Sequence, residues 1–217
     1  MSRPWISTNL AISADGKISS PLHRPSGWTS REDHQRLREL RRGADALMVG
    51  RGTLTQDRMT LTVAEDGPLA PTQPLRCVVS RTGGIPAEHP LFSTPGGPIH
   101  LLVTAGLAPE FSAALPAGVT VHRQTLPEFL ATLATDHAVA RLHCEGGGEL
   151  ISSLANLGVI DEFHLTLAGH TLFGGRQAPT ATGIPGHFLP AAATFSLTHF
   201  DPRPDLGECF LSYTRRV

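Results

Sequence analysis

The order of the expected elements predicts an α/β fold with a mostly parallel central sheet, helices on both faces and antiparallel strands at one edge. Compact apolar runs alternate with helix-like segments over most of the chain, which is the pattern of successive strand–helix units. Glycine-rich turns follow two of these runs and lead into helices. The last two strand-like segments have no helix between them, which indicates an antiparallel pair.

Strands are expected where short apolar or alternating runs are bounded by turn residues. Residues 5–12 alternate between apolar and polar side chains, and the turn sequence Asp15-Gly16-Lys17 follows them, so they are expected to form the first strand. The other strands are expected at residues 44–49, 75–79, 99–103, 119–122, 138–144 and 163–167, with the terminal pair at 194–200 and 208–213.

Helices are expected where capping signals and apolar spacing coincide. Ser30 can cap a helix whose first turn carries Glu32 and Asp33, and this helix should run to Arg42 and end at Gly43. Further helices are expected directly after residue 53 and at 111–115, 129–133 and 149–157, with loops at 66–74 and 169–190.

The composition is that of a globular protein. Hydrophobic residues make up 40% and charged residues 17% of 217 residues, which we expect to form a single domain. The net charge of −1 comes without a basic block, so no nucleic-acid partner is expected. Neither a signal-peptide pattern nor an apolar run of about 18 residues is present, so no membrane segment is expected. Cys77, Cys144 and Cys209 are widely spaced and are interpreted as reduced thiols of a cytoplasmic protein.

Two glycine-rich turns are candidate phosphate-binding loops. Gly146-Gly147-Gly148 lies between an apolar run and a helix, where glycines allow close approach of a ligand and the helix start offers free N–H groups. Gly50-Arg51-Gly52-Thr53 is a second turn of this kind. Ligands of open α/β sheets bind at the carboxyl ends of strands, so both turns could hold one pyrophosphate. Tight strand-to-helix turns explain the same residues equally well.

Several polar groups near these turns could bind a ligand or take part in catalysis. Ser80 and Arg81 follow an apolar strand and could hold a 2′-phosphate, although a surface arginine is the commoner interpretation. Lys17 and Glu145, together with the neighbouring carboxylates, could polarise a hydride acceptor, or they could be solvated surface groups. The eleven histidines form no zinc motif, so no metal is expected and most are interpreted as surface or packing residues.

Taken together, these stretches resemble the reductase domain of the riboflavin-biosynthesis deaminase/reductase family and its stand-alone archaeal and bacterial relatives. The resemblance runs in order from about residue 3 to residue 175. The matching stretches are residues 13–18, Trp28-Thr29-Ser30 with Arg38 and Arg41 in the following helix, residues 45–50 with Gly52, Thr53 and Asp57, Leu61-Thr62-Val63, and Cys144-Glu145-Gly146-Gly147-Gly148 followed by Leu150, Leu154 and residues 159–162.

The resemblance implies a dihydrofolate-reductase-like three-layer fold, a homodimer and NADPH as cofactor. It also implies reduction of the ribosylamino group of a pyrimidinone 5′-phosphate to ribitylamino. Lys17 and Glu145 would act on the reacting centre as catalytic residues, and Arg41 would pair with the substrate phosphate. The implied cofactor contacts are Ala14, Trp28, Thr53, Asp57, Ser80, Arg81, Gly147, Gly148, Glu149, Leu150, Ile151, Ser152 and Ser153, and the implied substrate contacts are Lys17, Ser26, Arg41, Leu61 and Glu145.

The sequence departs from the family pattern between Asp57 and Ala64. A proline common in the family is absent here, and Ala64 stands where the family often has a phosphate-binding arginine, a role that Arg58 could take. This departure keeps open a reductase of another small heterocycle, such as a pterin. A non-catalytic NADPH-binding protein is a third possibility, against which the retained Lys17, Asp57 and Glu145 argue. No deaminase zinc signature precedes the reductase-like stretches, so only the reduction step is expected.

Overall fold

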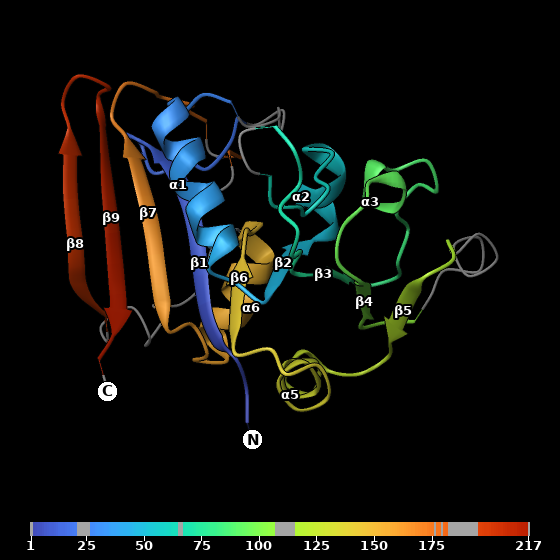
Figure 1. Ribbon diagram of the computed structural model, residues 1–217. Coiled ribbons are helices and arrows are strands. Elements are labelled where there is room, and N and C mark those ends of the chain that lie inside the picture. Colours follow the sequence, from blue (N-terminus) through green and yellow to red (C-terminus); the bar gives the residue numbers. More distant parts are fainter. Residues whose placement is uncertain are drawn as a thin grey trace. The chain divides into compact units, whose positions relative to one another are not determined.

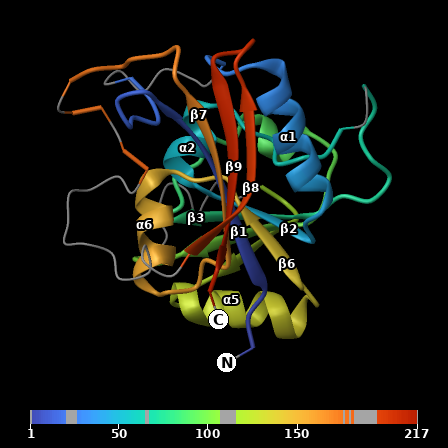
Figure 2. The same cartoon turned by 90° about the vertical axis from the view of Figure 1, so that its left-hand side faces the viewer.

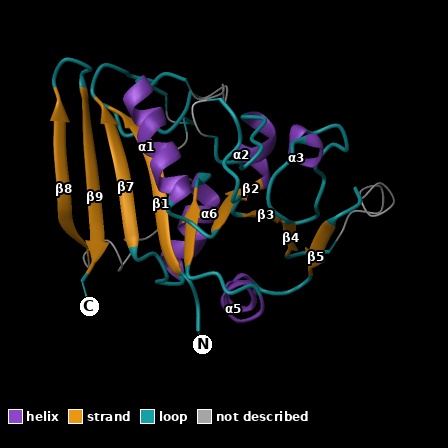
Figure 3. Cartoon of the chain, viewed as in Figure 1, coloured by secondary structure: helices purple, strands orange, loops and turns teal. Residues whose placement is uncertain are grey.

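A computed structural model describes residues 2–20, 27–64, 67–106, 116–175, 177–178, 180–181 and 195–216. These residues contain helices and strands in alternation and end in a strand pair (Figure 1; Figure 3). They group into two compact units, the first made of Met1–Trp5 and Arg38–His143 and the second of Ile6–Leu37 and Cys144–Val217. Each unit is described by itself below. Within the described ranges, no helix combines the length and the apolar character that crossing a bilayer requires.

The first unit is built on a parallel sheet. Its strands run in the order β5 (Val119–His122), β4 (Ile99–Val103), β3 (Leu75–Ser80) and β2 (Ala46–Gly50), followed by β6 (Arg141–Cys144). β2, β3, β4 and β5 pair in parallel, and β2 and β4 are buried along almost all of their length because such a sheet is covered on both faces.

The core of the first unit forms between this sheet and its helices. The short helices α2 (Arg51–Gln56) and α3 (Pro90–Ser93) lie on one side of the strands in Figure 1, and α5 (Leu126–Asp136) lies on the other. The main cluster is fully or almost fully buried and consists of Leu47, Val49, Leu54, Leu61, Val78, Ile85, Leu91, Ile99, Leu101 and Val103. Phe129, Leu130 and Leu133 of α5 are also buried.

The second unit combines one parallel and two antiparallel strand pairs. β1 (Trp5–Ser13) pairs in parallel with β7 (Glu162–Ala168), β7 pairs antiparallel with β9 (Glu208–Arg215), and β9 pairs antiparallel with β8 (Phe195–Arg203). Figure 2 shows α1 (Arg31–Arg42) and α6 (Gly148–Asn156) on opposite sides of these strands. The last pair is the antiparallel edge that the sequence predicts.

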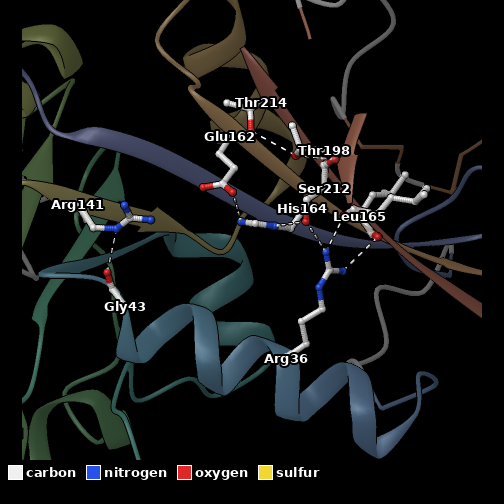
Figure 4. A network of polar contacts seen from close by, with 10 residues as sticks. Arg36, Gly43, Arg141, Glu162, His164, Leu165, Thr198, Ser212 and Thr214 are labelled. Carbon is white, nitrogen blue, oxygen red and sulfur yellow. Dashed lines mark hydrogen bonds and ion pairs between the residues drawn. The ribbon is translucent and has the colours of Figure 1, made fainter. Parts of the chain in front are cut away.

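Polar side chains attach the start of α1 to the strands. Ser30 caps the helix by accepting a hydrogen bond from the N–H of Asp33 at 3.1 Å, and Ser30 itself donates to Glu208 of β9 at 2.6 Å. The buried Asp33 carboxylate accepts a hydrogen bond from Thr166 of β7 at 2.5 Å. Arg36, one turn further along, bridges β7 and β9 (Figure 4). The helix is therefore held by hydrogen bonds on a face that its polar sequence alone would leave solvated.

The expected α/β class and most strands are confirmed, while several boundaries differ for local reasons. The helix expected at 129–133 is longer because Thr125 and Glu128 form a capping box at its start. The strand expected from residue 138 begins at Arg141, since Ala138 adopts a left-handed φ of 53°. α3 was not expected; it begins at Pro90 and is capped by His89. The helix expected at 111–115 lies outside the described residues.

Candidate active site

The turn after β1 holds Lys17 in a network of short-range hydrogen bonds. The hydroxyl of Ser13 accepts from the N–H of Lys17 at 3.0 Å and donates to Asp15 at 2.5 Å. The N–H of Ser13 donates to the carbonyl of Lys17 at 2.9 Å, and Gly16 at φ +75° closes the turn. The backbone of Lys17 is thus fixed while its half-buried side chain extends from it. Lys17 is the single lysine of the sequence.

Asp15 ties this turn to the loop that follows β7. Its carboxylate accepts hydrogen bonds from the N–H groups of Gly174 at 2.8 Å and Phe173 at 3.3 Å. The hydrogen bond from Ser13, followed by that from Gly174, lowers the pKa of the Asp15 carboxyl below its ordinary value. Asp15 therefore remains ionised at neutral pH and serves to anchor the loop.

Two predicted cofactor residues contact the same loop. The N–H of Ala14 donates to the carbonyl of Thr171 at 2.9 Å. The half-buried ring of Trp28 meets the ring of Phe173 edge-on, with centroids 4.9 Å apart and an interplanar angle of 88°. Ala14, Lys17 and Trp28 thus share one neighbourhood with this loop. Ser26, a predicted substrate contact, lies outside the described residues.

Glu145 opens the glycine loop that leads from β6 into α6. Gly146 adopts φ +97°, and a Cβ there would lie 3.6 Å from Leu10 and 3.8 Å from Ile151. The peptide bond between Gly146 and Gly147 is cis. Gly147 is the N-cap of α6, and no described side chain caps this helix start. Its first N–H groups keep the donor character that suits a phosphate group.

The predicted cofactor residues of α6 divide between the surface and the core. Leu150 and Ile151 are buried, so their side chains pack inside the unit and only their backbone could face a ligand. Glu149 and Ser153 are exposed, and Ser152 is half-buried. The hydroxyl of Ser153 donates to the carbonyl of Glu149 at 2.9 Å. The exposed start of the helix therefore offers backbone and small polar groups together.

In the first unit, the second glycine turn leads from β2 into α2. Gly50 is the N-cap and, among the described residues, has no side-chain capping bond. A Cβ at Gly52 would meet no atom within 4 Å, so the space beside this glycine is open. Thr53 is half-buried in the first turn, and Asp57 ends the helix by donating its N–H to the carbonyl of Thr53 at 3.0 Å.

The end of α1 places two arginines beside the segment that departs from the family pattern. Arg41 donates from Nη1 to the carbonyl of Thr62 at 3.3 Å. Arg42 donates from Nη2 to the carbonyl of Ala64 at 3.4 Å. Positive charge thus lies at the backbone of the position where the family often carries an arginine. Arg58 is exposed and adopts a left-handed φ of 49°.

The side chains of Leu61 and Ser80, which were predicted to contact ligands, take part in packing and in a turn of the first unit. Leu61 is fully buried in the main cluster of the first unit and adopts φ +53°. The hydroxyl of Ser80 donates to the carbonyl of Gly83 at 2.8 Å and accepts from its N–H at 3.0 Å, which closes the turn after β3. Arg81 beside it is exposed.

The structure also adds residues that the sequence pattern did not single out. Phe173 and Gly174 come from a stretch expected only to be a loop, and they contact Asp15 across 158 and 159 positions of sequence. Arg42, which donates to the carbonyl of Ala64, was not predicted to contact a ligand. No local spacing signals these long-range contacts, because they depend on where separate loops end in the fold.

Proteins of similar sequence carry reductase names. A reductase of 2,5-diamino-6-ribosylamino-4(3H)-pyrimidinone 5′-phosphate from Archaeoglobus fulgidus is 34% identical over 192 residues, covering 82% of this chain and 85% of that protein. The protein of the same name from Methanothermobacter thermautotrophicus is 32% identical over 182 residues, with 82% and 83% covered.

Solved structures show the same fold. Acinetobacter baumannii RibD superposes with a TM-score of 0.79 at 21% identity, covering 99% of this chain and 59% of that one. Dihydrofolate reductase from Enterococcus faecalis, complexed with NADP(H) and RAB-propyl, gives a TM-score of 0.56 at 14% identity, with 98% and 97% covered. The dihydrofolate-reductase-like fold is thereby confirmed. The family model of the RibD C-terminal domain matches residues 4–199, and the chain belongs to this family.

Proposed function

We propose that this protein is an NADPH-dependent reductase that converts the ribosylamino group of 2,5-diamino-6-ribosylamino-4(3H)-pyrimidinone 5′-phosphate to a ribitylamino group. Two relatives that it matches over most of their length carry this substrate in their names. The observation that carries the proposal is in the second unit, where the single lysine lies in the turn after β1 and Glu145 directly follows β6, each next to a glycine. On the family resemblance alone, we extend the proposal to a homodimer.

The residues present fit a nicotinamide dinucleotide phosphate. The start of α6 lacks a side-chain cap, and its glycines leave the first N–H groups accessible to a pyrophosphate. The open space beside Gly52 and the uncapped start of α2 fit a second set of cofactor contacts, with Thr53 and Asp57. The exposed Arg81 is the group suited to a 2′-phosphate, since Ser80 already closes a turn.

The proposed chemistry adds a hydride and a proton across a carbon–nitrogen double bond of the opened sugar. NADPH, when bound, supplies the hydride to C1′. Lys17 and Glu145 orient and polarise the acceptor, and one of them holds the proton that the substrate nitrogen gains. The turn formed by Ser13, Asp15 and Gly16 fixes the backbone of Lys17 for this task.

Binding of the substrate phosphate is assigned to the end of α1. Arg41 and Arg42 both reach the backbone of residues 62–64, so the segment that lacks the usual arginine has two guanidinium groups beside it. A guanidinium pairs well with phosphate oxygens because its donors form a planar fork. This observation favours a phosphorylated substrate over a pterin-like heterocycle without phosphate.

The test follows NADPH oxidation by absorbance with the pyrimidinone 5′-phosphate, its dephosphorylated form and a pterin as separate substrates. We expect turnover with the phosphorylated compound, a much higher KM without the phosphate, and little turnover with NADH. Lys17→Met should lower kcat by about 100-fold or more, whereas Lys17→Arg should restore part of it if positive charge suffices. An amine-directed reagent should modify one side chain, and substrate should protect it.

Two outcomes would replace this proposal. Turnover of the pterin without turnover of the pyrimidinone would assign the chain to another heterocycle. Tight NADPH binding without oxidation by any of the three substrates would support a non-catalytic NADPH-binding protein instead.

A further inference from the structure

Three histidines of the first unit lie together at the outer edge of its sheet, and none of them is assigned to the proposed reduction. His100 is in β4, His122 is in β5, and His137 directly follows α5. In the parallel register of β4 and β5, His100 lies opposite Thr120 and Leu102 lies opposite His122. His100 and His122 are therefore diagonal neighbours on the same face, because side chains two positions apart share a face.

The three imidazoles are close enough to share one ion. Nδ1 of His100 lies 2.9 Å from Nε2 of His122, and the rings of His100 and His137 have centroids 4.4 Å apart. One nitrogen from each ring falls within 4.8 Å of the other two. Ligand nitrogens on a tetrahedral Zn²⁺ are roughly 3.3 Å apart, as Zn–N bonds of about 2.0–2.1 Å require. A rotation of the exposed His137 side chain would bring its nitrogen to this spacing from the other two.

The surroundings of the cluster favour the uncharged form of His100 and His122. His100 is 3% exposed, His122 is half-buried, and His137 is exposed, so the cluster opens to solvent on one side. Burial, followed by the neighbouring histidines, lowers the pKa of His100 to about 4, and burial also lowers that of His122. The ring of Phe129 packs 4.8 Å from that of His122 and limits its rotation. Neutral imidazole is the form that binds metal ions.

We propose that His100, His122 and His137 bind a divalent transition metal ion of the zinc type, with water as the fourth ligand on the exposed side. Three imidazoles and a water suit Zn²⁺, Co²⁺ or Ni²⁺ better than Mg²⁺ or Ca²⁺, which prefer oxygen ligands. In the metal-free protein, the N–H of one neutral imidazole donates a hydrogen bond to the unprotonated nitrogen of the other across the 2.9 Å contact. On metal binding this proton moves to the far nitrogen of its own ring, and both facing lone pairs become ligands.

The proposed ion would join β4, β5 and the end of α5 at this edge of the sheet. β5 is a four-residue strand that pairs with β4, and in the strand order it stands at the end of the sheet. None of its residues is fully buried, and Val119 and Val121 pack against the main cluster as partly buried side chains. A metal ion would link it to β4 and to the end of α5. We therefore assign the ion a structural role and expect reductase turnover to be independent of it.

The test compares chelator-treated protein with and without one equivalent of Zn²⁺. Titration calorimetry should show one Zn²⁺ per chain, and the ion should raise Tm by on the order of 5 °C. Co²⁺ should give the visible absorption of a tetrahedral nitrogen site. His137→Ala removes an exposed ligand with little risk to folding, and it should weaken binding at least tenfold and abolish the Tm shift. His199→Ala removes an exposed histidine of β8 and should change neither.

The outcomes separate a built site from adventitious binding. His122→Gln provides a second variant, and it should lose the Co²⁺ spectrum while keeping the unfolding transition of the metal-free protein. The proposal would be overturned if the parent protein bound no stoichiometric Zn²⁺, or if His137→Ala bound it as tightly as the parent. A Zn²⁺ effect that His199→Ala removes would also overturn it.

Discussion

At the scale of single residues, His89 shows how burial and two hydrogen bonds can fix one protonation state. Its Nδ1 accepts from the N–H of Leu91 at 3.2 Å and so caps α3, while Nε2 faces the carbonyl of Leu54 at 3.2 Å. The side chain is 4% exposed. A proton on Nε2 satisfies the carbonyl and leaves Nδ1 as acceptor, so the neutral ring matches both partners.

This arrangement predicts that stability falls in mild acid. Burial, as the largest effect, lowers the pKa of His89 in the folded state. The hydrogen bond to the carbonyl of Leu54 opposes this shift, the charge of Arg58 adds to it, and the charge of Glu88 opposes it least. The unfolded chain therefore takes up this proton first, and the contribution of His89 is lost as pH falls below about 6.5. His89→Asn keeps a capping acceptor without the titration. Between pH 7.5 and 5.5, urea unfolding should show that the parent loses about 1 kcal/mol more stability than the variant, because His100 and His122 titrate in both.

At the scale of elements, Arg36 connects a helix to two strands of the second unit. Its Nη2 donates to the carbonyl of Leu211 at 2.6 Å and to the hydroxyl of Ser212 at 3.0 Å, and Nη1 donates to the carbonyl of Leu165 at 3.2 Å (Figure 4). Burial lowers the pKa of this guanidinium, while the charge of Asp33 opposes the shift. The hydrogen bonds of Arg36 therefore hold this face of the helix to the strands, where apolar side chains would usually do so.

Removing this connection should cost stability without altering the proposed site. Arg36→Ala leaves the strand carbonyl groups without their guanidinium donors, so we expect a loss of about 2–3 kcal/mol in unfolding free energy. Arg38→Ala, an exposed arginine of the same helix, should change it by less than about 0.5 kcal/mol. Chemical denaturation measures both variants. A loss of equal size in the two would attribute the effect to helix propensity rather than to the bridge.

Element prediction succeeded where the signal is local. The strands at 99–103 and 119–122 were predicted with the bounds that the structure has, because turn residues enclose each run. α3 was missed because its cap is a histidine, which is an unusual capping residue, and its helix has only four residues. The candidate site depended on the family resemblance. Contacts such as Asp15 with Gly174 join distant loops and leave no periodic signal in the sequence.

At the scale of the whole molecule, the fold and its family follow from the order of motifs, whereas the histidine cluster does not. His100, His122 and His137 are 22 and 15 positions apart, and their proximity depends on strand register and on where α5 ends. Zinc motifs that can be read from sequence contain pairs of ligands only a few residues apart. The eleven histidines were therefore interpreted as surface or packing residues, and three of them gather only in the folded chain.

The proposed reductase separates cofactor binding from chemistry, and one residue can test this separation across the whole protein. If Glu145 acts on the reacting centre, Glu145→Gln should lower kcat by about 100-fold while the rise in Tm caused by NADPH stays within about 1 °C of that of the parent. The amide keeps the size of the side chain and removes its proton chemistry. Glu88→Gln, an exposed residue of the first unit, serves as the matched control and should alter neither quantity.

Unchanged turnover in Glu145→Gln would exclude Glu145 from catalysis and leave Lys17 as the candidate that polarises the acceptor. A lost NADPH effect on Tm would instead make Glu145 a cofactor contact.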